Sequence, residues 1–192
     1  KIPKEVAKQT IAVLDKIITV SDYIASHVRE RYPEADSKLQ TIYAGVDIDD
    51  FPKRGSAKAA ALARDAKTAL AIDSGPIILY VGRLSKSKGP DILLDAMPEV
   101  VARYPDAKLV MVGSQKFGSN VTNRYVEEIW KKAAPLGKNV IFAGYIPYQD
   151  VNKYFAAGDV FVCSSQWNEP LARVHYEAMA AGLPIITTNR GG

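Results

Sequence analysis

The sequence has a single cysteine, Cys163, so it can form no intramolecular disulfide. This excludes a small disulfide-stabilised scaffold and favours a reducing compartment, so we expect a cytoplasmic location. No apolar run approaches the roughly 18 residues of a membrane-spanning helix, and the charged segment 1–9 does not resemble a signal peptide. A water-soluble protein is therefore expected.

The sequence also has no block of Lys and Arg residues, because its 25 basic residues are spread among 21 acidic ones. It therefore offers no basic footprint for nucleic acid, and its net charge of +4 favours anionic ligands only weakly. Hydrophobic residues make up 47% of the chain, which is ordinary globular composition. A length of 192 residues fits one domain and part of another.

Several ligand-binding motifs are absent as well. No Gly-x-Gly-x-x-Gly pattern follows a predicted strand, which argues against a nicotinamide or flavin dehydrogenase. The segment 113–119 has the glycine spacing of a phosphate-binding Walker loop, but Ser119 stands where that loop requires lysine. His27 and His175 lie far apart in the sequence, and neither has another metal-binding type of residue at a spacing typical of metal sites. These features exclude an NTPase motif and indicate no histidine metal site.

From residue 77 onward, short β-branched runs alternate with amphipathic segments. Such alternation predicts an α/β fold with a doubly wound, Rossmann-like parallel sheet and helices on both faces. The predicted strands are 77–81, 108–112, 139–143, 160–163 and 184–187, and the predicted helices are 89–104, 121–135, 148–157 and 169–181.

The preceding region differs, because its elements are too few to close a core. We predict helices over 6–14, 21–31 and 57–71, and short strands over 16–20 and 39–43. We therefore expect 1–50 to be part of another domain, and 51–192 to form the main domain, which is incomplete at its C-terminus.

The loop after the first strand of the main sheet combines glycines with two separated cations at the start of a helix. Gly82 makes the backbone of this loop flexible. The planar guanidinium group of Arg83 offers several hydrogen-bond donors, and the ammonium group of Lys88 offers a compact positive charge. Together with the helix N-terminus, this loop could hold a diphosphate. The alternative is an ordinary polar strand-helix loop.

The segment after the fourth strand places carboxylates around a predicted helix start. Pro170 suits a first turn, so the amides of Leu171, Ala172 and Arg173 would point toward a ligand. Glu169, at the N-terminus of the predicted helix, could accept hydrogen bonds from hydroxyl groups of a ligand. Glu177 lies two turns further along the helix, about 12 Å at 1.5 Å per residue. Both glutamates could equally be structural, Glu169 as a partner of the helix dipole and Glu177 as an exposed residue.

Tyr145 and Ile146 follow the third strand of the main sheet. Tyr145 could stack near a nucleotide base or simply cap the strand. Asp47, Asp49 and Asp50 look like a metal-binding cluster, but they precede the sheet by many residues. We expect no metal there.

These motifs in this order resemble the C-terminal, donor-binding half of glycosyltransferase family four, the group 1 glycosyltransferases with the GT-B fold. The run 169–182 also resembles the spore-coat branch of this family. Where the family usually has Phe-Gly after Glu-Pro, this chain has Leu171 and Ala172, which restricts how closely the backbone can approach the donor. The segments that carry the resemblance are 18–21, 43–47 with Phe51, 81–84 with Lys88 and Gly89, and 169–170 with 177–178.

The resemblance implies a retaining hexosyltransferase that uses a nucleoside-diphosphate sugar, expected to be a UDP-sugar, with no other cofactor and no metal. It implies that Arg83 and Lys88 bind the diphosphate, Glu169 the sugar hydroxyls and Glu177 the ribose. It also implies that the amides of 171–173 contact sugar and phosphate. By the same resemblance, 1–50 would be the tail of the N-terminal acceptor domain with its crossover, and 51–192 the C-terminal domain that binds the nucleotide sugar. The acceptor would be a glycan, a lipid or a small molecule, and peripheral membrane contact would come through the absent acceptor domain. By itself the chain is expected to bind the donor without transferring sugar.

Two alternatives stay open. The first is a non-catalytic, coat-associated or structural protein that keeps the GT-B fold, since fold does not determine function. The second is a phosphorylase or nucleotide-sugar epimerase of the same architecture.

Overall fold

The computed structural model describes residues 3–115 and 122–192. The predicted Walker-like segment 113–119 therefore lies partly outside the described residues. The contacts between Cα atoms divide the chain into two compact units, each described by itself below. The first unit comprises Lys1–Gly45, Asn168–Arg173 and Arg190–Gly192, and the second comprises Val46–Trp167 and Val174–Asn189.

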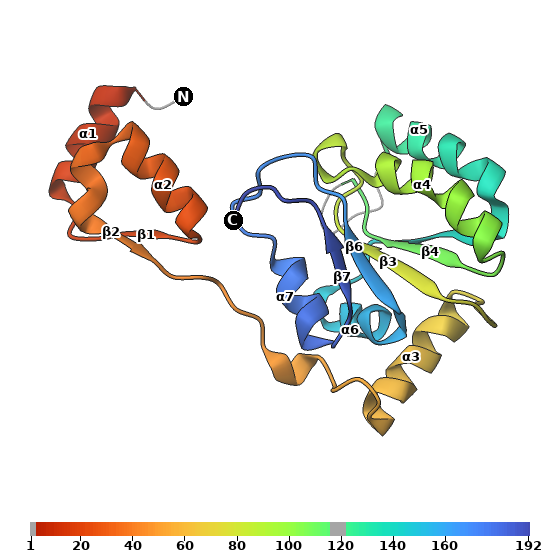
Figure 1. Cartoon of the computed structure of the whole chain (residues 1–192). Coiled ribbons are helices and arrows are strands. Elements are labelled where there is room, and N and C mark those ends of the chain that lie inside the picture. The colour runs from red at the N-terminus through yellow and green to blue at the C-terminus, as the bar shows by residue number, and fades with distance from the viewer. Residues whose placement is uncertain (1–2, 116–121) are drawn as a thin grey trace. The chain divides into compact units, whose positions relative to one another are not determined.

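The second unit is built on a five-stranded sheet in which every neighbouring pair of strands is parallel. The spatial order is β5-β4-β3-β6-β7 (Figure 1), so β3 lies at the centre and the chain winds outward from it in both directions. The strands are β3 (Ile77–Val81), β4 (Lys108–Val112), β5 (Val140–Gly144), β6 (Val160–Cys163) and β7 (Ile185–Thr187).

Helices cover both faces of this sheet (Figure 1). One face carries α3, α6 and α7, and the other carries α4 and α5. Their bounds are α3 (Ala57–Ala69), α4 (Pro90–Arg103), α5 (Arg124–Ala133), α6 (Tyr148–Ala157) and α7 (Arg173–Ala180). Short 3₁₀ turns are η2 (Ile48–Asp50), η3 (Lys86–Lys88) and η4 (Ala134–Asn139).

Two apolar cores result from the alternation of side chains along the central strands. Leu79 and Val110 face α6, where Phe155 is fully buried. Leu109 and Met111 face the opposite way and pack against α4 and α5. Because consecutive strand residues point to opposite faces, strands that are buried on both sides must be apolar throughout. This explains the continuous apolar runs of the sequence and confirms the predicted doubly wound α/β fold.

The start of the second unit packs against the rest of it through an aromatic side chain. Phe51 is 4% exposed and its ring lies edge-on to Phe155, with centroids 5.7 Å apart. Asn152 donates to the backbone carbonyl oxygen of Asp50 at 2.8 Å. These contacts fix the start of the second unit.

The first unit contains a two-stranded parallel sheet, β1 (Ile17–Thr19) and β2 (Leu39–Thr41), with α1 (Lys4–Val13), α2 (Asp22–Arg31) and η1 (Pro33–Lys38). Ser21 caps α2, because its hydroxyl accepts from the Ile24 amide at 3.2 Å. The assignment of 1–50 to an acceptor domain and of 51–192 to a donor domain stays a prediction.

Candidate functional site

The loops that follow β3, β4, β5 and β6 all leave the sheet at its carboxyl edge, because these strands are parallel. The chain runs from β3 outward to β4 on one side, and it later returns to form β6 on the other side of β3. In open α/β sheets, ligands bind beyond the carboxyl ends of the strands at such a switch point. The candidate site is therefore the region beyond β3 and β6.

The loop after β3 is held to the loop after β4 by backbone hydrogen bonds. The Gly82 amide donates to the Val112 carbonyl oxygen and the Leu84 amide to that of Ser114, both at 3.0 Å. Leu84 is buried in the core under α4, and the Tyr80 hydroxyl donates to the Arg83 carbonyl oxygen at 2.7 Å. The backbone of Arg83 is thus fixed while its side chain is exposed.

Gly113 allows the close approach of these two loops. Its φ is +133°, and a side chain there would collide with the Gly82 carbonyl oxygen. Only glycine adopts this backbone conformation without strain. Gly113 therefore contributes to the position of the Gly82–Arg83 backbone.

Lys88 lies at the end of η3, directly before Gly89, the residue that precedes α4. Gly89 adopts the left-handed conformation with φ +63°, and Pro90 occupies the first helical position. A side chain at Gly89 would collide with the carbonyl oxygen of Ser164, so the loop after β6 lies against the start of α4. The sequence-predicted proximity of Lys88 to the helix N-terminus is confirmed.

Two buried serines at the end of β6 hold this turn in place. The Ser164 hydroxyl donates to the Gly89 carbonyl oxygen at 2.7 Å and lies 3.1 Å from that of Lys88. The Ser165 hydroxyl donates to the Ser87 carbonyl oxygen at 3.1 Å, and the Gln166 amide donates to the same oxygen at 2.7 Å. We call these contacts the serine clamp. Sequence reasoning did not identify it, although serines directly after a buried strand at a switch point were the available signal.

The structure places Glu177 on α7 with only 6% of its surface exposed. The sequence-based expectation of a residue near the surface is therefore wrong. The predicted helix over 169–181 is also wrong at its start, because α7 begins at Arg173. Pro170 therefore does not occupy a first turn, and the helical distance of about 12 Å between Glu169 and Glu177 does not apply.

Tyr145 and Ile146 follow β5, two strands away from β3. Both are half-buried, and Ile146 packs against the core under α6. Ile146 thus has a structural role, while a nucleotide contact for either residue stays a prediction.

The other predicted donor residues belong to the first unit: Glu169, Leu171, Ala172 and Arg173. Glu169 is 5% exposed, and its backbone carbonyl oxygen accepts from the Gly192 amide at 2.9 Å. The Pro170 carbonyl oxygen accepts from the Ser21 hydroxyl at 2.6 Å. The roles assigned to these residues by the family resemblance stay predictions.

The aspartate cluster of the crossover forms a local turn. The Asp47 carboxylate accepts from the Asp49 amide at 3.0 Å and so caps η2. Within residues 3–115 and 122–192, no group of three His, Cys, Asp or Glu side chains is placed to hold a metal ion.

None of the described helices is both long enough and apolar enough to cross a lipid bilayer. The cytoplasmic location stays a prediction.

Comparison with known proteins identifies the family. The model of the family described as "Glycosyl transferases group 1" matches residues 64–192, which include the loop after β3, the serine clamp and α7. The chain belongs to this glycosyltransferase family. The family resemblance read from the sequence motifs is thus confirmed.

Three proteins illustrate what this group 1 glycosyltransferase chain is similar to. It is 46% identical over 177 residues to Spore coat protein SA of Bacillus subtilis (strain 168), covering 92% of this chain and 47% of that protein. It is 43% identical over 185 residues to Putative glycosyltransferase YtcC of the same organism, covering 96% of this chain and 46% of that protein. The solved structure of Anabaena Alr3699/HepE in complex with UDP and glucose superposes with a TM-score of 0.77 at 26% identity, covering 98% and 48% of the two chains.

The chain thus spans about half the length of the relatives that it matches. Similarity to Spore coat protein SA agrees with the predicted spore-coat branch, and similarity to HepE agrees with the predicted GT-B architecture.

Proposed function

We propose that this chain forms the donor-binding part of a retaining glycosyltransferase that transfers a hexosyl group from a nucleoside-diphosphate sugar. The observation that carries this proposal is the loop from Gly82 to Gly89. It places Arg83 and Lys88 beyond the carboxyl end of the central strand, and the serine clamp fixes its backbone. Two cationic side chains on a fixed backbone at a switch point suit an anionic nucleotide.

The chemistry follows from where charge develops. When the bond between the sugar and the diphosphate breaks, negative charge accumulates on the leaving phosphate oxygen. Arg83 and Lys88 would stabilise this charge more strongly than that of the bound donor, and so would lower the barrier as well as bind. Because their backbones are already fixed, little reorganisation accompanies the reaction. Retention of configuration and the absence of an obligatory metal rest on the family resemblance alone.

A UDP-sugar is the proposed donor. Support comes from HepE, a structural neighbour at 26% identity, whose structure contains UDP and glucose. The acceptor would be a glycan, a lipid or a small molecule bound by the other half of the protein.

The test compares UDP with uridine by calorimetry. Arg83→Ala should weaken UDP roughly tenfold or more, since a hydrogen bond to a charged group contributes about 1.5 to 3 kcal/mol. Uridine, which has no phosphate, should bind as before. Arg64→Ala is the matched control, because Arg64 is an exposed arginine on α3. Equal losses for UDP and uridine in Arg83→Ala would contradict the proposal.

The same experiment with GDP and ADP tests the choice of base.

Glu177→Gln should weaken UDP and uridine alike if its carboxylate accepts hydrogen bonds from the ribose. Since Glu177 is 6% exposed, this variant must first be compared with the wild type in thermal unfolding. Loss of both ligands together with a large drop in midpoint would assign Glu177 to the scaffold.

The name of Spore coat protein SA favours a second candidate, a coat-associated protein without turnover. Hydrolysis of UDP-glucose by the full-length protein separates the two. Slow release of glucose, abolished by Arg83→Ala, supports the enzyme, whereas UDP binding without any release supports the coat-associated candidate.

A further inference from the structure

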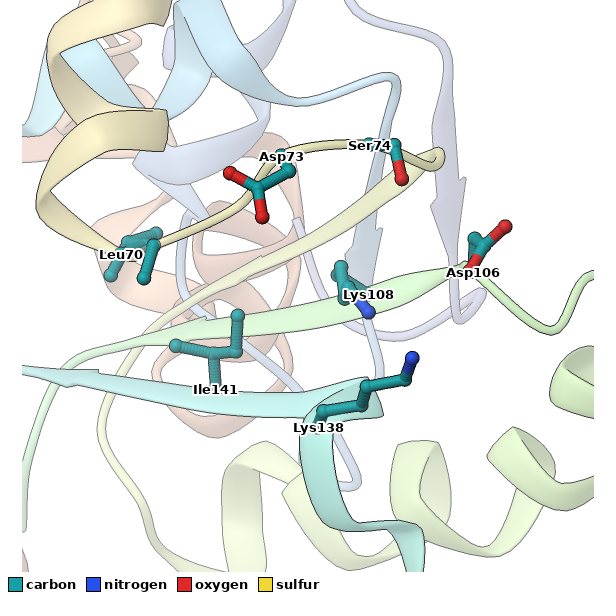
Figure 2. Close-up of a pocket in the computed structure, with 8 residues that line it drawn as sticks. Leu70, Asp73, Ser74, Asp106, Lys108, Lys138 and Ile141 are labelled. Carbon is teal, nitrogen blue, oxygen red and sulfur yellow. The ribbon is translucent and has the colours of Figure 1, made fainter.

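A pocket of about 350 Å³ opens in the second unit at the amino edge of the sheet (Figure 2). Leu70, from the end of α3, and Ile141, from β5, form its apolar wall. Its remaining lining comes from the first residue of β4 and from residues that precede β3, β4 and β5, at the edge opposite to the Gly82–Gly89 loop. The pocket is therefore separate from the candidate donor site.

A buried lysine distinguishes this pocket from an ordinary surface hollow. Lys108 is the first residue of β4 and is only 9% exposed. Neither its ammonium group nor that of Lys138 forms an ion pair or hydrogen bond with any described residue. The stem of Lys108 is buried, while its ammonium group reaches the open pocket, so an anion that enters the pocket would meet a cation held in place by its stem.

Figure 2 shows the ammonium groups of Lys108 and Lys138 directed toward one another at the amino ends of β4 and β5. Asp73 and Ser74 lie on the loop before β3, and Asp106 lies on the turn before β4. Two ammonium groups suit a phosphate dianion, whereas carboxylates and a hydroxyl suit the hydroxyl groups of a polyol. Together they match a ligand that carries both.

The walls of this pocket are held by hydrogen bonds. The Asn139 side-chain amide donates to the carbonyl oxygens of Pro105 and Ala107, both at 2.8 Å, and so ties the turn before β4 to the start of β5. The Lys108 amide donates to the Pro76 carbonyl oxygen at 2.9 Å. The pocket therefore exists before a ligand binds, which lowers the entropic cost of binding.

We propose that this pocket binds a small phosphorylated polyol, with the phosphate between Lys108 and Lys138 and the hydroxyl groups on Asp73, Ser74 and Asp106. Because it lies at the opposite edge of the sheet from Arg83 and Lys88, this ligand and the nucleotide bind without competing.

Glucose 6-phosphate is the test probe, with glucose and inorganic phosphate as partial ligands. In calorimetry the wild type should bind glucose 6-phosphate in the presence of saturating UDP, and should bind both partial ligands at least tenfold more weakly. Lys108→Met, which keeps the buried stem, and Lys138→Ala should each weaken binding roughly tenfold or more. The control Lys58→Met removes an exposed lysine of α3 and should change nothing.

The affinity for UDP should be the same in all of these variants. That result would keep the proposal independent of the donor site. If Lys108→Met fails to fold, Lys138→Ala decides, because Lys138 is exposed. The proposal is overturned if the wild type shows no binding at millimolar glucose 6-phosphate, if Lys138→Ala binds it as tightly as the wild type, or if UDP displaces it. Equal affinities for inorganic phosphate and glucose 6-phosphate would overturn the polyol part.

Discussion

At the scale of single residues, the hydroxyl groups of Ser164 and Ser165 determine the geometry of the predicted phosphate loop. Both serines are buried, and their hydrogen bonds reach the backbone carbonyl groups of Ser87, Lys88 and Gly89. They would not contact a nucleotide themselves. Their effect on binding would come through the position of Lys88.

We expect Ser164→Ala to weaken UDP several-fold, while uridine binds as before. The substitution leaves the Gly89 carbonyl oxygen without its 2.7 Å partner. The backbone that carries Lys88 can then move, and the unfolding free energy should fall by about 1 kcal/mol. Calorimetry with both ligands and urea unfolding measure the two effects.

Ser26→Ala is the matched control, since the Ser26 hydroxyl donates to the Tyr23 carbonyl oxygen within α2 of the first unit. It removes a comparable hydrogen bond and should leave both affinities unchanged. Unchanged UDP binding in Ser164→Ala, with normal folding, would mean that the clamp does not position Lys88.

Residue types at local spacing were enough to identify Arg83 and Lys88 as members of one loop. The serine clamp could not be found in the same way, because it joins segments more than 70 residues apart. Its existence depends on β6 lying beside β3, which no local pattern specifies. Lys108 was likewise predicted only as part of a strand, and its burial at a pocket depends on the neighbouring loops.

At the scale of elements, α4 and α5 are joined on one face of the sheet by a partly buried polar contact. The Tyr125 hydroxyl of α5 donates to the Asp91 carboxylate in the first turn of α4 at 2.8 Å. Burial, followed by this hydrogen bond to a carboxylate, raises the pKa of the Tyr125 hydroxyl above its ordinary value. The folded protein therefore keeps this proton to higher pH than the unfolded chain does.

The sign of the pH dependence follows from this difference. Above about pH 10 the unfolded chain loses the Tyr125 proton while the folded protein retains it, so the unfolded state gains stability as the pH rises. We expect the unfolding free energy to decrease from pH 9 to pH 11, and to decrease less steeply in Tyr125→Phe. At pH 7 the variant should be less stable by about 1 kcal/mol, owing to the lost hydrogen bond. Urea unfolding across this range measures both, and parallel pH profiles would contradict the assignment.

The strands were predicted well where both faces of the sheet are buried. The strands over 77–81, 108–112 and 160–163 coincide with β3, β4 and β6, because strands covered on both sides must be apolar throughout. The start of α7 was not predicted. Pro170 suits a first turn locally, but the carbonyl oxygens of Glu169 and Pro170 accept hydrogen bonds from Gly192 and Ser21, which hold this segment outside the helix. Contacts between distant segments of the first unit thus override a local preference.

At the scale of the whole molecule, the positive charge that would contact the nucleotide belongs to individual side chains. The net charge of +4 is spread over the chain, so the attraction would come from Arg83 and Lys88 at one edge of the sheet rather than from a basic surface. In the conspicuous acidic cluster of Asp47, Asp49 and Asp50, the Asp47 carboxylate caps the turn η2 by accepting from the Asp49 amide. These two features together predict how binding responds to metal ions.

We expect UDP to bind equally well with EDTA and with Mg²⁺ or Mn²⁺, within about twofold, because in the proposed site Arg83 and Lys88 would supply the positive charge that a bound metal would otherwise provide. Calorimetry in EDTA, followed by addition of excess Mn²⁺, measures this directly.

Asp47→Asn is the matched variant, since asparagine also caps a helical turn and so preserves η2 while it removes a carboxylate. It should leave the UDP affinity unchanged under every condition. Binding that disappears in EDTA and returns with Mn²⁺ would contradict metal-independent recognition, and if Asp47→Asn also prevented that return, the aspartate cluster would be the metal site.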